Sequence, residues 1–273
     1  MTQTGEQPTT GYAPANGVDI YWESRGSGGT PLVLLHGGYG LTSMFDALVG
    51  PLAADRQVIA LELQGHGHTA DTDRPFSWDA FGDDVAGVTR QLGLGPVDLL
   101  GCSLGGVTAL RCAIRNPETV RRLIVVSAPF RRSAWFPEVL AGFDHMTAAT
   151  LFDLLRQGPP YAQFAKVAPD PASFTSLIDK TGALLRQPYD WGPEVAQLGL
   201  PVLLVYGDSD SIPPSHAAEF FSLLGGGQRD AGWDGGLPTA SRLAIAPGRT
   251  HYNILDWPAL AATIAEFCAL SGG

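Results

Sequence analysis

The 273-residue chain is short of basic residues and contains no long apolar run. Its 17 Lys and Arg residues are outnumbered by 27 Asp and Glu residues, so the formal net charge is −10. Because such a chain offers little basic surface to displace counterions from phosphates, we expect no nucleic-acid partner. No apolar run approaches the roughly 18 residues that a membrane-spanning helix requires, so we expect no association with a membrane.

Cysteine is also scarce, with three residues in the chain: Cys102, Cys112 and Cys268. They are an odd number in a chain long enough to bury a large core without disulfides. We therefore expect reduced, buried thiols, which favour a cytoplasmic location. Residues 1–17 lack the basic and apolar segments of a signal peptide, and we expect them to form a flexible tail.

Glycine and short apolar runs are abundant, and the 34 Gly and 21 Pro residues indicate many tight turns. Phe81, Val85 and Val88 follow a helical spacing between two of the runs. The runs themselves are apolar without alternation, which is typical of parallel strands covered by helices on both faces. The sequence therefore predicts an α/β fold with a doubly wound, mostly parallel sheet flanked by helices. Its strands are expected at 32–35, 58–61, 97–100, 123–126, 202–205 and 243–246, with an edge strand at 18–24.

One spacing between runs is much longer than the others, because the runs at 123 and 202 start 79 residues apart. This spacing predicts an insertion at 129–197 that forms a helical cap over the carboxyl edge of the sheet. Within it, helices are expected around 137–156 and 173–186, separated by a break at Gly158-Pro159-Pro160. The core then comprises residues 18–128 and 198–273, with a glycine-rich loop at 225–241 before the last strand.

The pentapeptide Gly101-Cys102-Ser103-Leu104-Gly105 lies between a predicted strand and a helix-compatible stretch. G-x-S-x-G in this context indicates a nucleophile elbow, a sharp turn that projects the Ser hydroxyl while the glycines avoid clashes. The hydroxyl needs a base within hydrogen-bond reach and a third group that orients the base. Of the three histidines that follow, His145, His216 and His251, we expect His251 to be the base, because it follows the last strand at its carboxyl end.

The orienting acid is expected at the carboxyl end of the preceding strand, where Gly207-Asp208-Ser209-Asp210 lies. On position alone, either Asp208 or Asp210 fits. With these motifs the sequence resembles the α/β-hydrolase fold superfamily, in particular its serine esterases and lipases, whose triad runs in the order Ser, acid, His. The resemblance covers residues 18–270 and implies that Asp210 is the acid and Asp208 helps to shape the turn.

The segment His36-Gly37-Gly38 matches the His-Gly-x segment that the family carries after an early strand. The resemblance implies an oxyanion hole formed by two backbone N–H groups, one from Gly38 and one from Leu104, the residue after the nucleophile. His36 itself is expected to be structural.

Two other features suggest different chemistry. His66-Gly67-His68, followed by Asp71, could open a dinuclear metal site, but its spacing departs from the metallo-hydrolase pattern and resembles the family's Gly-His-Gly-x-Ser turn instead. We therefore expect no metal and no cofactor. Cys102 adjoins Ser103, but in an elbow its side chain is expected to point away from the site.

The predicted cap is rich in aromatic residues, which could either line an apolar substrate pocket or pack against one another. The sequence leaves both interpretations open. These residues are Phe130, Trp135, Phe136, Phe143, Phe152, Tyr161, Phe164, Phe174, Tyr189 and Trp191.

Together these features predict a carboxylesterase-type serine hydrolase that cleaves small, mainly apolar carboxylic esters through an acyl-enzyme, with Ser103, Asp210 and His251 as the triad. Lactone hydrolysis and carbon–carbon bond hydrolysis on the same triad are alternatives, because fold does not select among them. The carbon–carbon hydrolases of the family usually have Trp directly after the triad His, where this chain has Tyr252. A ligand receptor that retains the hydrolase fold is the alternative from another class. In each case the partner is a small molecule.

Overall fold

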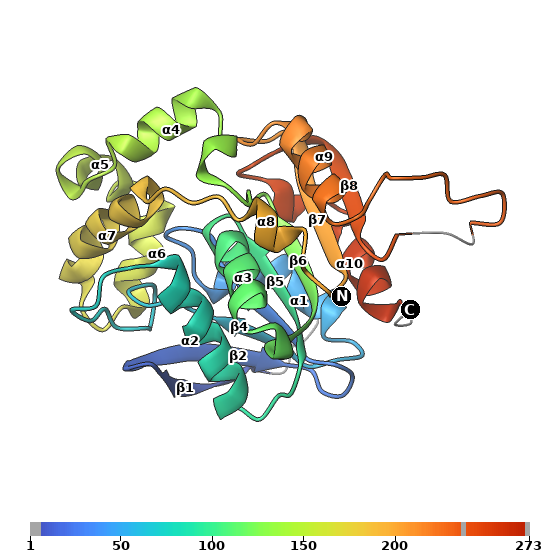
Figure 1. The fold of residues 1–273 in the computed structure, drawn as a ribbon. Helices are drawn as coiled ribbons and strands as arrows, with labels where there is room; N and C mark the ends of the chain where they lie inside the picture. Colours follow the sequence, from blue (N-terminus) through green and yellow to red (C-terminus); the bar gives the residue numbers. More distant parts are fainter. Residues whose placement is uncertain (1–6, 236–238, 271–273) are drawn as a thin grey trace.

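The core of the molecule is one sheet with the strand order β1-β2-β4-β3-β5-β6-β7-β8 (Figure 1). It is seen in a computed structural model that describes residues 7–235 and 239–270. The strands are β1 (Thr9–Ala15), β2 (Val18–Arg25), β3 (Leu32–Leu35), β4 (Val58–Leu61), β5 (Val97–Cys102), β6 (Val120–Val126), β7 (Val202–Ser209) and β8 (Arg242–Thr250).

The sheet is parallel from β4 to β8, and β1 and β2 add an antiparallel pair at the β4 edge. Successive side chains of a strand point to opposite faces. In β3, Val33 and Leu35 join one buried cluster while Leu32 and Leu34 join another. Because both faces are covered, every position of such a strand must be apolar. The predicted doubly wound, mostly parallel sheet is confirmed.

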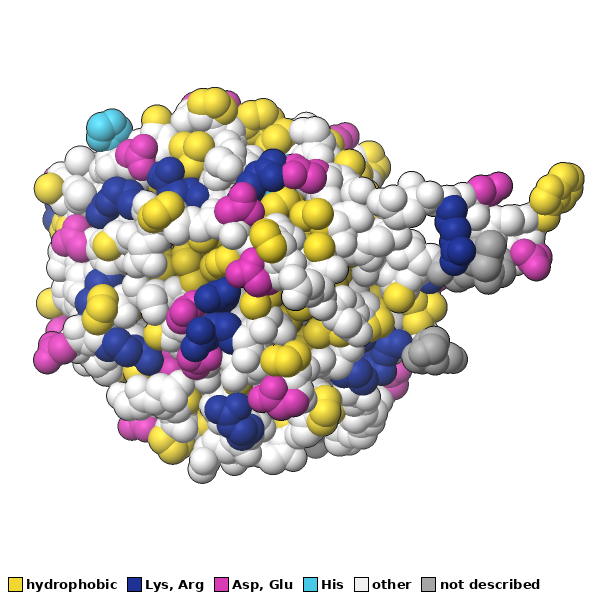
Figure 2. Space-filling view, viewed as in Figure 1, with side chains coloured by type: hydrophobic (Ala, Val, Ile, Leu, Met, Phe, Trp, Pro, Cys, Tyr) yellow, Lys and Arg dark blue, Asp and Glu magenta, His cyan; other side chains and the backbone are white. Residues whose placement is uncertain are grey.

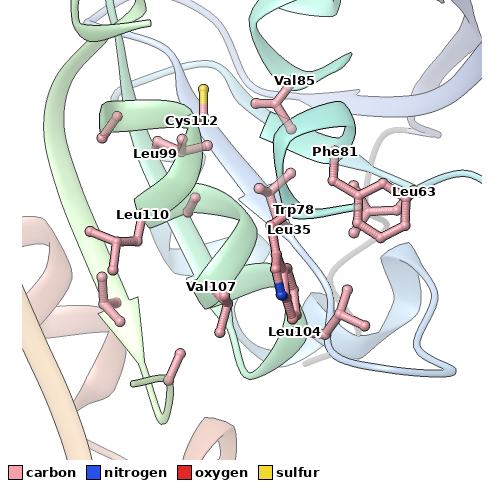
Figure 3. Close-up of a cluster of buried hydrophobic side chains, with 14 of the residues drawn as sticks. Leu35, Leu63, Trp78, Phe81, Val85, Leu99, Leu104, Val107, Leu110 and Cys112 are labelled. Carbon is pink, nitrogen blue, oxygen red and sulfur yellow. The ribbon is translucent and has the colours of Figure 1, made fainter. Parts of the chain in front are cut away.

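Helices cover both faces of this sheet. Phe81 of α2, Leu110 of α3 and Phe220 of α9 pack on one face, and Leu52 of α1 and Phe267 of α10 pack on the other. Figure 3 shows the first cluster where α2 and α3 meet the sheet. The helices are α1 (Asp46–Leu52), α2 (Trp78–Gln91), α3 (Leu104–Arg115), α4 (Pro137–Asp144), α5 (Ala148–Leu155), α6 (Pro159–Val167), α7 (Phe174–Arg186), α8 (Gly192–Val195), α9 (Pro214–Leu223) and α10 (Leu260–Ala269). Single 3₁₀ turns are η1 (Thr42–Phe45), η2 (Pro117–Thr119), η3 (Arg132–Ala134), η4 (Pro171–Ser173) and η5 (Ile254–Asp256).

The chain between β6 and β7 runs through α4 to α8, and Figure 1 shows α4 to α7 grouped together beside the sheet. Polar contacts tie α7 to the loop that follows β4. The Lys180 ammonium donates to Asp71 Oδ1 at 2.8 Å, and the Ser176 hydroxyl donates to Asp71 Oδ2 at 2.8 Å. Lys180 also donates to the carbonyl oxygens of Thr72 and Arg74. The Asp71 carboxylate is therefore one of several groups that hold the helical segment to the core, together with the carbonyl oxygens of Thr72 and Arg74.

The prediction of a flexible tail over 1–17 is wrong for Thr9–Ala15, which form β1 and pair with β2 along its whole length. Asn16 and Gly17 connect the two strands with φ values of 48° and 84°. A two-residue hairpin turn of type I′ requires positive φ at both positions, and Asn-Gly is its preferred sequence. The dipeptide Asn16-Gly17 is therefore the sequence feature from which this hairpin could have been predicted. Residues 1–6 lie outside the described residues.

The helices between β6 and β7 also differ from those predicted. The expected helix over 137–156 is divided into α4 and α5 by the turn at His145. Gly158-Pro159-Pro160 does not simply interrupt the helical structure, because Gly158 is the N-cap of α6 and both prolines lie in its first turn. Proline is accepted there since the first N–H groups of a helix have no intrahelical acceptor.

Figure 2 shows acidic and basic side chains interspersed over the face in view. Arg115 of α3, for example, pairs with Asp79 and Asp83 of α2 at 3.1 and 2.8 Å. The predicted glycine-rich loop extends from the body of the molecule, with Trp233 fully exposed, and its residues 236–238 lie outside the described part. Within 7–235 and 239–270, no helix combines the length and hydropathy needed to cross a bilayer.

Asp71→Ala is expected to lower the free energy of unfolding by about 1.5–3 kcal/mol, because it removes the acceptor of three side chains, those of Gln64, Ser176 and the charged Lys180. Asp153→Ala is the matched control, since the exposed Asp153–Arg156 pair is expected to contribute no more than about 0.5 kcal/mol. Urea unfolding of both variants measures the difference. Equal losses would contradict the role given to Asp71.

Candidate active site

Ser103 sits in a strained turn between β5 and α3, with φ 54° and ψ −118°. This left-handed region is unfavourable for a residue with a side chain, so the surroundings must hold it. The chain packs too closely for side chains on either side of the turn. A Cβ on Gly101 would lie 2.0 Å from the carbonyl oxygen of Gly105, and one on Gly105 would lie 2.2 Å from that of Leu35. Because a side chain at either position would clash with the backbone, both positions of the motif require glycine.

Three side chains that are far apart in the sequence meet at this turn. His251 follows β8, and its Nε2 lies 2.9 Å from Ser103 Oγ. Its Nδ1 lies 3.0 Å from Oδ1 of Asp210, which follows β7. Each of the three residues lies at the carboxyl end of a parallel strand, and these ends share one edge of the sheet. The structure thus brings together the residues proposed from the sequence as nucleophile, base and acid.

The Asp210 carboxylate is buried and surrounded by donors. Its Oδ2 accepts hydrogen bonds from the Ser127 hydroxyl at 2.5 Å and from the Gly207 N–H at 3.2 Å. Burial opposes ionisation, but the bonds from His251, Ser127 and Gly207 outweigh it and hold the pKa of Asp210 below its ordinary value. An ionised Asp210 favours the His251 tautomer with hydrogen on Nδ1, which leaves Nε2 free to accept the Ser103 proton.

Asp208, the other acid considered from the sequence, lies elsewhere. Its Oδ2 accepts from the Gly248 N–H at 2.9 Å, in an exposed position on the turn. Ser127 was not predicted, although it supports Asp210 directly. It follows β6 in a left-handed conformation, with φ 49°. No sequence motif marks it, because its contact with Asp210 depends on the neighbouring placement of β6 and β7.

Gly38 and Leu104, the proposed oxyanion donors, come from the loop after β3 and from the first turn of α3. A Cβ on Gly38 would lie 3.9 Å from Leu104 Cδ1, so the two segments are in contact. Within the described part of the chain, neither backbone N–H has an acceptor. Both are therefore available to an oxygen atom brought to the Ser103 hydroxyl.

His36 fixes the loop that carries Gly38. Burial and the neighbouring His66 lower the pKa of His36 to about 3, so its ring is neutral at pH 7. Its Nε2 accepts from the Leu63 N–H at 3.0 Å, so Nδ1 carries the hydrogen and donates to the carbonyl oxygen of Gly37 at 2.7 Å. This tautomer ties the end of β3 to the chain after β4, which agrees with the structural role expected for His36.

Ser103 and His251 open into a cavity of about 320 Å³ with a mainly apolar lining. Met44 and Val107 come from the core, while Val139 and Leu185 come from the segment between β6 and β7. No Lys, Arg, Asp or Glu among the described residues lines it. A site of this kind accommodates small apolar groups next to the reacting atoms.

The aromatic residues of the segment predicted to form a cap divide between the two interpretations left open by the sequence. Trp135, Phe143 and Tyr189 line the cavity, and Trp135 also meets the His251 ring edge-on at 5.3 Å between centroids. Phe174 does not line the cavity and packs against the rings of Phe152, Tyr161 and Phe164 in its own segment and against Tyr39 in the loop after β3. Some rings therefore shape the cavity and others hold the helices together.

The residues of the alternative metal site have separate partners. His66 Nδ1 lies 3.1 Å from the carbonyl oxygen of Gln64, and His68 Nδ1 lies 3.0 Å from Glu62 Oε2. Asp71 holds Lys180 and Ser176, as described above.

The remaining candidates are Cys102, which is buried beside Ser103 and is among the residues that line the cavity, and the histidines His145 and His216. Burial raises the pKa of the Cys102 thiol to about 12, with a further contribution from the Asp210 charge, so it is not a thiolate at pH 7. His145 is exposed between α4 and α5, and His216 is buried against Phe130.

Gly105→Ala is expected to destabilise the fold by more than about 3 kcal/mol, because backbone atoms of β3 occupy the space of the new methyl group. Gly142→Ala in α4 is the matched control. No atom lies within 4 Å of the added Cβ, so the change is expected to stabilise by about 0.5–1 kcal/mol through helix propensity. Urea unfolding measures the stability of both variants. If Gly105→Ala leaves the free energy of unfolding unchanged, the turn can accommodate a Cβ and the explanation is wrong.

Ser127→Ala removes a hydrogen bond to the ionised Asp210, and we expect a loss of about 1.5–3 kcal/mol in unfolding free energy at pH 7. Because the folded-state pKa of Asp210 is lowered, its carboxylate contributes stability above the unfolded pKa of about 3.9 and loses it as pH falls through the folded-state value. The deficit of the variant should therefore shrink from pH 7 to pH 3. The same deficit at both pH values in urea unfolding would refute the explanation.

Comparison with known proteins agrees with this fold. A family model for the α/β hydrolase fold matches residues 30–224. The pimeloyl-[acyl-carrier protein] methyl ester esterase of Neisseria meningitidis serogroup C is 32% identical over 252 residues, which covers 80% of this chain and 87% of that protein. The protein of the same name from Yersinia pseudotuberculosis is 31% identical over 258 residues, which covers 88% of this chain and 93% of the relative.

Among solved structures, E-2-(acetamidomethylene)succinate hydrolase superposes with a TM-score of 0.74 at 21% identity, covering 97% of this chain and 100% of the other. At 21% identity, this similarity shows a shared fold and nothing about function. The family model, in contrast, spans well over half of the chain, and the curated relatives share more than 30% of its residues over most of its length. The resemblance noted from the motifs is confirmed, and this chain belongs to the α/β hydrolase fold family.

Proposed function

We propose that the protein hydrolyses carboxylic esters through an acyl-enzyme formed on Ser103. The observation that carries this proposal is the continuous set of hydrogen bonds from Asp210 through His251 to the Ser103 hydroxyl, at the wall of an apolar cavity. Ester hydrolysis is also supported by the curated relatives, which are named as methyl ester esterases.

In the first half of the reaction, Ser103 Oγ attacks the ester carbonyl while His251 Nε2 takes its proton. The N–H groups of Gly38 and Leu104 donate to the carbonyl oxygen as it becomes negative. The tetrahedral intermediate then expels the alcohol, which receives its proton from His251, and the acyl group stays on Ser103. Water next attacks this ester with His251 again as the base, and collapse returns the proton to Ser103 and releases the carboxylic acid.

Asp210 keeps the His251 ring in one orientation and stabilises the imidazolium that forms in each half-reaction. The cavity volume and its apolar lining support small, mainly apolar substrates, and no step requires a metal or an organic cofactor. The three cysteines are free and buried, which supports a reducing compartment, and we place the protein in the cytoplasm.

Ser103→Ala is expected to lower kcat/KM for p-nitrophenyl acetate at least about 10³-fold, because the nucleophile is lost while the surrounding cavity is retained. Ser222→Ala, on the exposed surface of α9, serves as the control and should keep the parental rate. Initial rates followed by release of p-nitrophenol measure both variants. Hydrolysis by Ser103→Ala at the parental rate would overturn the mechanism.

A fluorophosphonate probe separates an enzyme from a receptor that retains the fold. An enzyme should be labelled on Ser103 and should also turn over simple esters many times. Labelling without turnover would favour the receptor.

A further inference from the structure

Two polar residues interrupt the apolar lining of the cavity without any assigned partner. Trp78 and Thr181 both line it, and their side chains are almost completely buried, at 4% and 1% exposure. Neither Trp78 Nε1 nor Thr181 Oγ1 makes a hydrogen bond of good geometry within the described residues, and the polar group that interacts with Thr181 is the Tyr39 hydroxyl. Buried polar atoms are rarely left unpaired, because a donor removed from water loses its hydrogen bond without compensation.

The location of these two atoms sets them apart from other unpaired groups. Trp22, Thr108 and His216 also carry unpaired buried atoms, but they do not line this cavity. An unpaired donor inside a close-packed core can have no ligand, whereas Trp78 and Thr181 belong to the wall of a cavity beside the Ser103 hydroxyl.

Trp78 belongs to the part of the wall next to the nucleophile. It is the first residue of α2, and Figure 3 shows its indole beside Leu104 and Val107, which line the same cavity. The ring of Tyr189 from the cap meets the indole edge-on, at 5.6 Å between centroids. These aromatic contacts hold the indole ring in place but leave its N–H without an acceptor.

Thr181 belongs to α7, the helix that Lys180 and Asp71 tie to the core. The Tyr39 hydroxyl lies close to it and donates to the Met146 sulfur at 3.2 Å, a weak acceptor. Tyr39 and Met146 line the cavity as well. The wall around Thr181 is therefore rich in hydroxyl groups and poor in strong acceptors.

The geometry points to a substrate that carries a neutral hydrogen-bond acceptor, such as a ketone, ether or second ester oxygen, at a distance from the scissile carbonyl. Trp78 and Thr181 would bind this oxygen. A carboxylate is disfavoured because no Lys or Arg among the described residues lines the cavity to balance its charge. This inference rests on the proposed ester hydrolysis and narrows its substrate class to oxygen-bearing esters.

The test compares esters that differ only by the added oxygen. The panel pairs methyl hexanoate with its 4-oxo and 5-oxo analogues, and hexyl acetate with 2-butoxyethyl acetate. The parent protein is expected to favour at least one oxygenated member about 10-fold in kcat/KM over its alkyl counterpart. Thr181→Val or Trp78→Phe should bring that ratio close to 1, since each removes one donor; Thr181→Val does so with little change in shape, whereas Trp78→Phe also leaves a smaller ring.

Thr108→Val and Trp22→Phe are matched controls, because each makes the same substitution at an unpaired buried group outside the cavity. Both should keep the parental ratio. The inference is overturned if no oxygenated ester is favoured, or if Thr181→Val and Trp78→Phe slow every ester by the same factor, as a purely structural role would.

Equilibrium binding to the Ser103→Ala protein separates this inference from the proposed function. If Ser103-dependent hydrolysis of the alkyl esters occurs without preference for added oxygen, ester hydrolysis stands and this inference falls. If no ester is hydrolysed but an oxygenated ester binds about 10-fold more tightly than its alkyl counterpart, and Thr181→Val abolishes that difference, the recognition site stands and the proposed hydrolysis falls.

Discussion

The turn at Ser103 is the constraint on which the rest of the site depends. β5 must end, reverse and begin α3 within one residue, in a conformation that is unfavourable for a side chain. The backbone of β3 and the first turn of α3 lie so close that neither Gly101 nor Gly105 can carry a Cβ. The same closeness brings the loop of Gly37 and Gly38 against Ser103, so the packing that strains Ser103 also places beside it the N–H groups that we propose as oxyanion donors.

Much of this arrangement could be predicted because its signals are local or follow from topology. Strands covered on both faces are uniformly apolar, as at β3, and the elbow combines two glycines with a strand and a helix. Parallel strands place their carboxyl ends together, which brings His251 and Asp210 to Ser103 from distant positions. The choice of Asp210 over Asp208 required the family resemblance, and the structure places Asp210 beside His251 and Asp208 on an exposed turn.

Other features depend on contacts that the sequence does not encode locally. β1 is an edge strand with exposed, partly polar side chains, so it lacks the apolar run that marks a central strand. Ser127 reaches Asp210 only because β6 and β7 are neighbours in the sheet. The cavity wall combines Trp78 from the core with Thr181 and Tyr189 from the inserted segment, so no single stretch of sequence reveals its shape or its unpaired polar atoms. For the same reason, the sequence could not show which aromatic residues of the inserted segment line the cavity and which pack against one another.

The central claim is that Ser103 becomes covalently acylated during turnover. Acid-quenching the protein during hydrolysis of p-nitrophenyl butyrate, followed by digestion and mass spectrometry, measures this directly. The account predicts a peptide containing Ser103 whose mass is increased by one butyryl group, absent from a His251→Ala protein quenched at the same time. Steady hydrolysis with the butyryl group on another residue would contradict it.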